Sequence, residues 1–200
     1  MKKIIIAIDS FKGCLTSAEA GKAAEKGIKS INPSCHTSVI PIADGGEGLL
    51  DVLITATKGK YITLSAHGPL MKMAKTHYGL SGNGRTAIIE MAAISGLPLV
   101  PIEQRNPMLT TTFGTGELIK DALNKGCRNF IIGIGGSATN DAGLGMLQAL
   151  GFRFLDKSGH TLGTGGQIME AVANIDTSGI HPALRETHFM VACDVANPFY

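Results

Sequence analysis

The stretch from residue 131 to residue 145, IIGIGGSATNDAGLG, constrains the fold of this 200-residue chain more than any other part of the sequence. Apolar, mostly β-branched residues give way to glycines and small polar residues, and apolar residues then return at a helical spacing. This order predicts a strand, a polar turn and the start of a helix. Glycine lets the backbone approach a ligand closely, and N–H groups at a helix start attract anions. A plain strand-to-helix turn uses the same residues, so glycine content alone leaves both interpretations open.

Composition indicates a globular protein and argues against several kinds of partner. Hydrophobic residues make up 44% of the chain and 26 residues are glycine, which fits a protein with a buried core. The net charge of +2 is small and the basic residues form no block, so we expect no nucleic-acid partner and no membrane partner. The apolar run at 4–8 ends at Asp9 and is too short for a signal peptide or a membrane span. Scattered cysteines without a C-x-x-C pair favour reduced thiols, and we predict a cytoplasmic protein.

Two strand–loop–helix units are predicted before residue 60. Strands at 4–8 and 37–42 are each followed by a polar loop and then by a helix, at 18–28 and 49–56. The continuous apolar run of the first strand is typical of strands covered on both faces. Two such units predict a parallel sheet with right-handed crossovers, as in Rossmann- or flavodoxin-like folds.

Polar residues follow both of these predicted strands. In open α/β sheets ligands gather at the carboxyl ends of the strands, so this is where a site is expected. The residues placed there are Asp9, Ser10, Lys12, Asp44 and Glu47. Taken singly, each is better explained as a loop residue that caps a helix or solvates a turn. Thr16 and Glu19 are predicted to cap a helix in this way, in a capping box.

The character of the sequence changes near residue 60. Strands are predicted at 61–66, 73–80 and 85–90. The segment SGNG at 81–84 is a strong hairpin signal, so these strands predict an antiparallel meander. We therefore predict an α/β protein with two α/β domains. Residues 1–60 are the first segment of a domain with a parallel sheet, and residues 61–200 form a second, mixed domain that carries the glycine-rich stretch.

One interpretation of the glycine-rich stretch is a dinucleotide site. Gly133, Gly135 and Ala138 satisfy G-x-G-x-x-A after a predicted strand. Asp156 lies about twenty residues further on, at the end of the next predicted strand, where an acid that binds a ribose is expected. This pattern indicates a nicotinamide-dependent oxidoreductase. Against it, the turn is crowded with polar side chains, which suits phosphate handling better than bare backbone contact.

A second interpretation is phosphoryl transfer, which needs an anion cradle, a cation, a metal-binding carboxylate and a base. The cradle is 135–140 and the cation is Lys12, while the candidate carboxylates are Asp9, Asp44, Asp141 and Asp194. Neither a Walker A sequence nor the protein-kinase signature set occurs. A G-x-S-x-G hydrolase motif is also missing, and the histidines lie in no recognisable motif.

Short blocks along the whole chain resemble one family. They are DSFKG at 9–13, PIADGGEG at 41–48, RNP at 105–107, TTFGTGELI at 111–119, GIGGSATNDAGLGMLQALG at 133–151 and CDVANP at 193–198. Together, and in this order, they closely resemble the bacterial glycerate kinases of the two-domain glycerate 2-kinase type. The resemblance implies transfer of the γ-phosphoryl group of ATP, with Mg²⁺ as its companion, to a hydroxyl of D-glycerate. It favours 2-phosphoglycerate as the product, leaves 3-phosphoglycerate open, and implies that one α/β domain is inserted into the other.

The resemblance also suggests roles for individual residues. The phosphate-binding residues are Gly135, Gly136, Ser137, Thr139 and Asn140. Lys12 would neutralise phosphate charge, Asp44 would accept the proton of the glycerate hydroxyl, and Asp194 would bind the metal, with Asp141 as a second metal ligand. The roles of Asp44 and Asp194 can be exchanged. Arg105 would hold the substrate carboxylate in a bidentate way or form a structural ion pair. Asp9 and Ser10 complete the predicted substrate site, whereas Glu90 is interpreted as structural.

The length of the chain departs from the family pattern. Members of the family are nearly twice as long, so we expect this chain to be the N-terminal half of such an enzyme and to be weakly active or inactive by itself. A non-catalytic nucleotide-binding fragment is therefore a further alternative. Whether the protein is a homo-oligomer stays open.

Overall fold

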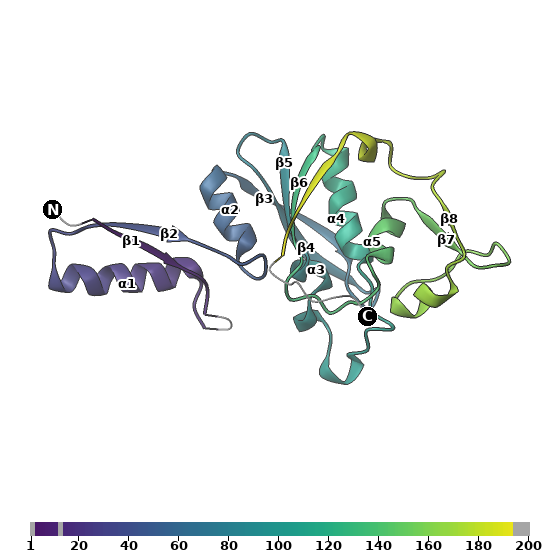
Figure 1. Cartoon of the computed structure of the whole chain (residues 1–200), viewed down its shortest axis with the longest axis horizontal. Coiled ribbons are helices and arrows are strands. Elements are labelled where there is room, and N and C mark those ends of the chain that lie inside the picture. The colour runs from purple at the N-terminus through teal and green to yellow at the C-terminus, as the bar shows by residue number, and fades with distance from the viewer. Residues whose placement is uncertain (1–2, 12–13, 194–200) are drawn as a thin grey trace.

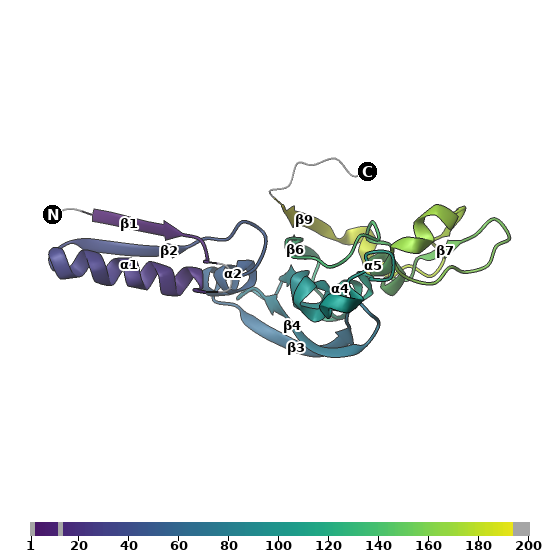
Figure 2. The same ribbon diagram turned by 90° about the horizontal axis from the view of Figure 1, so that it is seen from below.

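The computed structural model describes residues 3–11 and 14–193. Its N-terminal part is an arm that projects from the rest of the molecule (Figures 1 and 2). The arm consists of strand β1 (Lys3–Ile8), helix α1 (Ser17–Ile31) and strand β2 (His36–Pro41). The two strands pair in parallel, from Lys3 opposite His36 to Ile8 opposite Pro41. The predicted parallel sheet is therefore confirmed, with two strands in the described residues.

The predicted capping box at the start of α1 is also confirmed. The Thr16 hydroxyl accepts a hydrogen bond from the backbone N–H of Glu19, and the Glu19 carboxylate accepts one from the backbone N–H of Thr16. Both bonds satisfy N–H groups that the first turn of a helix leaves without an internal partner.

The prediction that β1 is covered on both faces is wrong for the described residues. Helix α1 packs on one face of the two-stranded sheet, where Ile6 is buried. On the other face Ile5 is 60% exposed and Ile40 is 48% exposed. An apolar run indicates that a strand can be buried on both faces, but burial of the second face requires another layer of structure that packs on it.

A five-stranded mixed sheet forms the centre of the molecule. Its strands are β3 (Lys60–His67), β4 (Met73–Leu80), β5 (Thr86–Glu90), β6 (Asn129–Gly133) and β9 (His188–Ala192), in the order β3-β4-β5-β6-β9. Strands β3, β4 and β5 pair antiparallel, which confirms the predicted meander. Strands β5, β6 and β9 pair in parallel, so their carboxyl ends lie on one edge of the sheet.

Helices cover both faces of this sheet. Along β5 the side chains alternate between the faces, as the period of a strand requires. Ala87 and Ile89 belong to the core cluster that contains α4 (Phe113–Asn124), whereas Ile88 packs with α2 (Leu49–Thr57). Helix α2 therefore packs on the central sheet, although it precedes residue 60. The division of the chain into domains at that residue stays a prediction.

Shorter elements surround this core. Helix α3 (Ala92–Ser95) follows β5, and α5 (Leu144–Ala149) packs against α4. Strands β7 (Arg153–Leu155) and β8 (Asn174–Asp176) pair antiparallel at the far end of the molecule from the arm (Figure 1). The 3₁₀ helices are η1 (Leu97–Leu99), η2 (Ile102–Gln104), η3 (Gly166–Ala171) and η4 (Pro182–Glu186). The predicted fold class, α/β with a parallel sheet and a mixed sheet, is confirmed.

The position of β7 contradicts the dinucleotide interpretation of the sequence. Strand β6, which leads into the glycine-rich loop, has β5 and β9 as neighbours, while β7 belongs to a separate sheet. The Asp156 carboxylate accepts hydrogen bonds from the backbone N–H groups of Ser158 and His160, so it stabilises its own turn. An acid that binds the ribose of a dinucleotide must lie on the strand next to the glycine loop.

Within the described ranges, no helix combines the length and the apolar character that crossing a lipid bilayer requires.

Candidate active site

Glycine-rich segments meet at the carboxyl ends of β2, β6 and β9. The Gly135 N–H donates to the Gly45 carbonyl oxygen, at 3.3 Å between nitrogen and oxygen. A methyl group on Gly135 would lie 2.6 Å from the Cα atom of Gly46, and one on Gly45 would lie 2.6 Å from the carbonyl oxygen of Ala192. Both distances are far below van der Waals contact, so this backbone-on-backbone packing requires glycine. The loop that carries Asp44 is thereby held against the loop that follows β6.

The loop from Gly135 to Asn140 is fixed by bonds from several elements. The Ala138 N–H donates to the Ser95 carbonyl oxygen over 2.8 Å, and the Leu97 N–H donates to the Gly136 carbonyl oxygen over 3.0 Å. The Thr110 hydroxyl donates to the Ala138 carbonyl oxygen. Gly136 has a φ angle of +71°, which favours glycine. Among the described residues, no hydrogen bond uses the N–H of Gly136 or Ser137.

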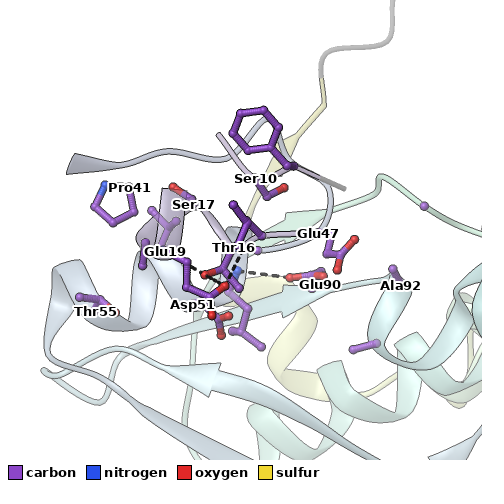
Figure 3. A pocket seen from close by; sticks show the side chains of 18 of the residues that line it. Ser10, Thr16, Ser17, Glu19, Pro41, Glu47, Asp51, Thr55, Glu90 and Ala92 are labelled. Atoms are coloured by element: carbon purple, nitrogen blue, oxygen red, sulfur yellow. Dashed lines mark hydrogen bonds between the residues drawn. The ribbon is translucent and has the colours of Figure 1, made fainter. Parts of the chain in front are cut away.

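A cleft of about 690 Å³ lies between the arm and the central sheet, at the edge where these loops meet (Figure 3). Its walls come from the start of α1, the loop before α2, the end of β5 and the glycine-rich loop. The polar and glycine residues that line it include Ser10, Thr16, Glu47, Asp51, His77, Glu90 and Gly136. Several elements distant in sequence therefore contribute to one concave site.

The floor of the cleft is acidic. Burial raises the pKa of Glu90 above its ordinary value, although N–H groups of Leu50 and Gly48 oppose this, and the nearby charges of Asp51 and Glu47 raise it further. The Tyr61 hydroxyl donates to Asp51, which is the main reason why the pKa of Tyr61 rises to about 12. The cleft thus already holds concentrated negative charge, and a negatively charged ligand needs donors or a cation beside it.

Two serines shape the end of the arm that faces the cleft. The buried Oγ of Ser10 has no hydrogen-bond partner among the described residues. Ser17, which the sequence interpretation missed, donates from its hydroxyl to the Ile8 carbonyl oxygen and accepts from the Ile42 N–H. It therefore ties the carboxyl ends of β1 and β2 together. A small hydroxyl residue directly after the N-cap Thr16 was the only sequence signal for this role.

The structure brings some predicted site residues together and leaves others apart. Asp44 is exposed in its loop, and its Oδ1 accepts a hydrogen bond from the Gly46 N–H. Asp9 accepts from the N–H of Ser10 at 2.6 Å. Arg105 is exposed, donates to the Val100 carbonyl oxygen and does not line the cleft. Lys12 and Asp194 lie outside the described residues.

The remaining predicted residues belong to the loop after β6. Ser137 and Thr139 share a hydrogen bond between their hydroxyls and are half-buried, and Asn140 is exposed. Only Gly136 of this loop lines the cleft itself. The loop therefore offers backbone N–H groups at its start and side-chain hydroxyls next to them.

Asp141 is 1% exposed, and its carboxylate is occupied by the protein. It accepts from the backbone N–H groups of Thr112, Gly143 and Gly145, and from the hydroxyls of Thr111 and Thr112. A metal ion at Asp141 would have to displace these donors. In the described part of the chain, no group of three or more His, Cys, Asp or Glu residues could hold a metal ion. The predicted Mg²⁺ ligand Asp194 lies outside the described residues, so the predicted metal site stays a prediction.

Comparison with known proteins gives a consistent result. The glycerate kinase family matches residues 4–200. The chain is 54% identical to a glycerate kinase of Bacillus subtilis (strain 168) and 50% identical to a glycerate 2-kinase of Escherichia coli (strain K12), each over 98% of its length. A crystal structure of a proposed glycerate kinase 2 from Salmonella typhimurium LT2 has a TM-score of 0.87 and 49% identity over 98% of the chain.

The chain spans about half the length of these relatives, 51% of each of the two kinases and 53% of the crystallised protein. The match runs through the loop before α2, the loop after β6 and the strands that position both. The chain therefore belongs to the glycerate kinase family.

Proposed function

We propose that this chain, within its full-length protein, contributes the phosphoryl-transfer site of an ATP-dependent kinase that converts D-glycerate to 2-phosphoglycerate. The observation that carries the proposal is membership of the glycerate kinase family, with relatives named glycerate kinase and glycerate 2-kinase. The cleft beside two glycine-rich loops supports it, because phosphoryl transfer depends mainly on positioning and charge stabilisation.

In this proposal the glycine-rich loop binds phosphate. The N–H groups of Gly136 and Ser137 donate to phosphate oxygens, and Gly135, Thr139 and Asn140 complete the cradle. Lys12 adds a compact positive charge. Fixed donors of this kind cost no reorganisation during the reaction, and in a cleft they act more strongly than in water. Mg²⁺ would accompany ATP and neutralise phosphate charge, with Asp194 as its proposed protein ligand.

Asp44 is the proposed general base. As the glycerate hydroxyl oxygen forms a bond to the γ-phosphorus and the bond from this phosphorus to the β-phosphate oxygen breaks, the hydroxyl proton passes to the Asp44 carboxylate. The bond from the Gly46 N–H orients that carboxylate within its loop. Ser10, whose buried hydroxyl has no partner among the described residues, binds the substrate with Asp9. We do not place Arg105 at the substrate carboxylate, because Arg105 does not line the cleft. We assign Asp141 to loop positioning instead of metal binding.

The decisive experiment measures ADP release by the full-length protein with ATP and D-glycerate, and locates the new phosphate by NMR. We expect ADP release that depends on D-glycerate, with the phosphate on the 2-hydroxyl. ATP binding without acceptor-dependent turnover would indicate a non-catalytic nucleotide-binding module and would overturn the proposal. Phosphate on the 3-hydroxyl would overturn only the assigned product. A cytoplasmic location and homo-oligomer formation stay predictions.

A further inference from the structure

Glu90 occupies a junction between the two loops of the site. It is the last residue of β5 and lies opposite Gly133, the last residue of β6. Its half-buried carboxylate lines the cleft and accepts a hydrogen bond from the Leu50 N–H at 3.4 Å (Figure 3). The backbone N–H of Gly48 also acts on this carboxylate, whose pKa it lowers. Glu90 thus joins the end of a central strand to the start of α2.

Helix α2 has no cap of its own. Its N-cap residue, Gly48, has a φ angle of +92° and provides no side-chain hydrogen bond. The first N–H groups of a helix need partners from outside it, and a negative charge near them is favourable because of the helix dipole. Glu90, which lies forty residues from Leu50 along the chain, provides an acceptor for these N–H groups and a negative charge near them. Helix α2 is therefore capped by a strand of the central sheet.

The loop before α2 is consequently held at two points. At one point the Gly45 carbonyl oxygen accepts from the Gly135 N–H. At the other, Glu90 holds the helix start, while the next residue, Met91, donates its N–H to the Gly133 carbonyl oxygen over 2.9 Å. Asp44 lies directly before the first point. Removing the second point would leave the Gly45–Gly135 bond and the packing of Ile88 against α2, but no acceptor for the N–H of Leu50 at the helix start.

We propose that Glu90 is a positioning residue for phosphoryl transfer, which holds the loop that carries Asp44 at a set distance from the Gly135–Ser137 cradle. This inference rests on the proposed function of Asp44 and of the cradle. In this proposal Glu90 acts through the backbone of residues 48–50 and not by contact with the acceptor hydroxyl or the phosphate. Glu90 holds the start of α2 through its acceptor oxygens, so a glutamine at this position, whose amide oxygen also accepts, should keep most of this positioning.

The test compares four variants of the full-length protein. In Glu90→Ala we expect kcat to fall about 10- to 100-fold with KM changed less than about threefold, because misplacement of a catalytic group mainly affects the transition state. Glu90→Gln restores kcat to within about threefold, since its amide oxygen still accepts. Glu90→Asp, which withdraws the carboxylate by one methylene group, falls between them and keeps the test valid if the alanine variant folds poorly.

Ser81→Ala is the matched control. Ser81 accepts from the Thr86 N–H at the opposite end of β5, so its loss weakens the same strand away from the cleft. We expect lower stability and unchanged kcat. Amide hydrogen exchange at Gly48 and Leu50 is measured in parallel, and it should accelerate in Glu90→Ala but not in Ser81→Ala.

Three results would overturn the inference: wild-type kcat in Glu90→Ala, an equal loss of kcat in Ser81→Ala, or no rescue by glutamine. Failure of the proposed function is recognised separately, because the wild-type protein would then show no turnover of D-glycerate. The exchange rates at Gly48 and Leu50 still report whether Glu90 holds the helix start.

Discussion

Two aspartates of the predicted site show that environment sets what a carboxylate can do. Both follow small or polar residues in loops after strands, so the sequence presents them alike. Asp44 is exposed in its loop, whereas Asp141 is buried and accepts hydrogen bonds from two hydroxyls and three backbone N–H groups. A buried carboxylate with this many donors stabilises the loops around it. An exposed carboxylate beside the glycine-rich loop can accept a proton.

We predict that Asp44→Asn lowers kcat of the full-length protein by about 10²- to 10⁴-fold, the usual contribution of a general base. The amide cannot accept the hydroxyl proton, but it can still accept the bond from the Gly46 N–H, so the loss of kcat should far exceed any loss of stability. Steady-state kinetics and thermal unfolding measure the two effects. Asp156→Asn removes the same charge from a turn in the separate β7–β8 region and should leave kcat unchanged. A near-normal kcat in Asp44→Asn would exclude Asp44 as the base.

We predict that Asp141→Asn lowers the free energy of unfolding by about 2–4 kcal/mol, because an NH₂ group would face backbone donors that now have an acceptor. Urea denaturation measures this loss. It should be equal in Mg²⁺ and in EDTA, since the proposed role is structural. A loss that appears only when Mg²⁺ is present would instead support the original prediction of a metal ligand.

At the scale of elements, α4 and α5 pack closely through glycine. A methyl group on Gly116 in α4 would overlap the Met146 carbonyl oxygen and lie 2.7 Å from the Ala149 Cβ atom. Gly27 in α1 is also helical and exposed, but nothing lies within 4 Å of a methyl group built there. Alanine substitutions at these two positions therefore distinguish the effect of close packing on stability from the effect of helix propensity.

We predict that Gly116→Ala destabilises the protein by about 1–3 kcal/mol, because overpacking against a backbone oxygen outweighs the gain in helix propensity. Gly27→Ala should stabilise it by about 0.5–1 kcal/mol, since only the propensity changes. Denaturant unfolding of both variants is the measurement. If both substitutions shifted stability in the same direction, close packing of α4 on α5 would not explain the glycine at 116.

At the scale of the molecule, the arm differs from the central sheet in how it is supported. Strands β1 and β2 form a two-stranded sheet with one helix, and an apolar face of this sheet is exposed. Strand β5 has a strand on each side and a helix layer on each face. Isolated two-stranded sheets are marginal in stability, and local opening is easiest where few apolar contacts are buried.

We predict that backbone amides of β1 and β2 exchange with solvent through local opening, at a lower free energy than those of β5 and β6. Native-state hydrogen exchange on the 200-residue chain measures both sets in one experiment. Substituting Ile5 by Thr should change the exchange of the arm less than substituting the buried Ile6, because Ile5 is 60% exposed. Equal protection of arm and sheet would show that they open as one cooperative unit.

Much of the local structure could be predicted from the sequence because it depends on neighbouring residues. The capping box at Thr16 and Glu19, the hairpin at 81–84 and the strand before the glycine-rich loop all have local causes, namely side-chain capping, turn geometry and a β-branched apolar run. The motif blocks also identified the family. Strand β8, three residues long, carries too short a pattern to be predicted.

Tertiary structure alone decided which of these local pieces meet. The sequence by itself determined the glycine-rich loop, but not that Gly135 packs on Gly46, nor that Asp156 lies outside the sheet that contains β6. It presented Asp44, Asp141 and Glu90 as three carboxylates in loops or at strand ends. In the tertiary structure Asp44 is exposed, Asp141 is buried and structural, and Glu90 caps a helix. The physical reason is that hydrogen bonding and desolvation act between residues far apart in sequence, and local pattern contains no record of them.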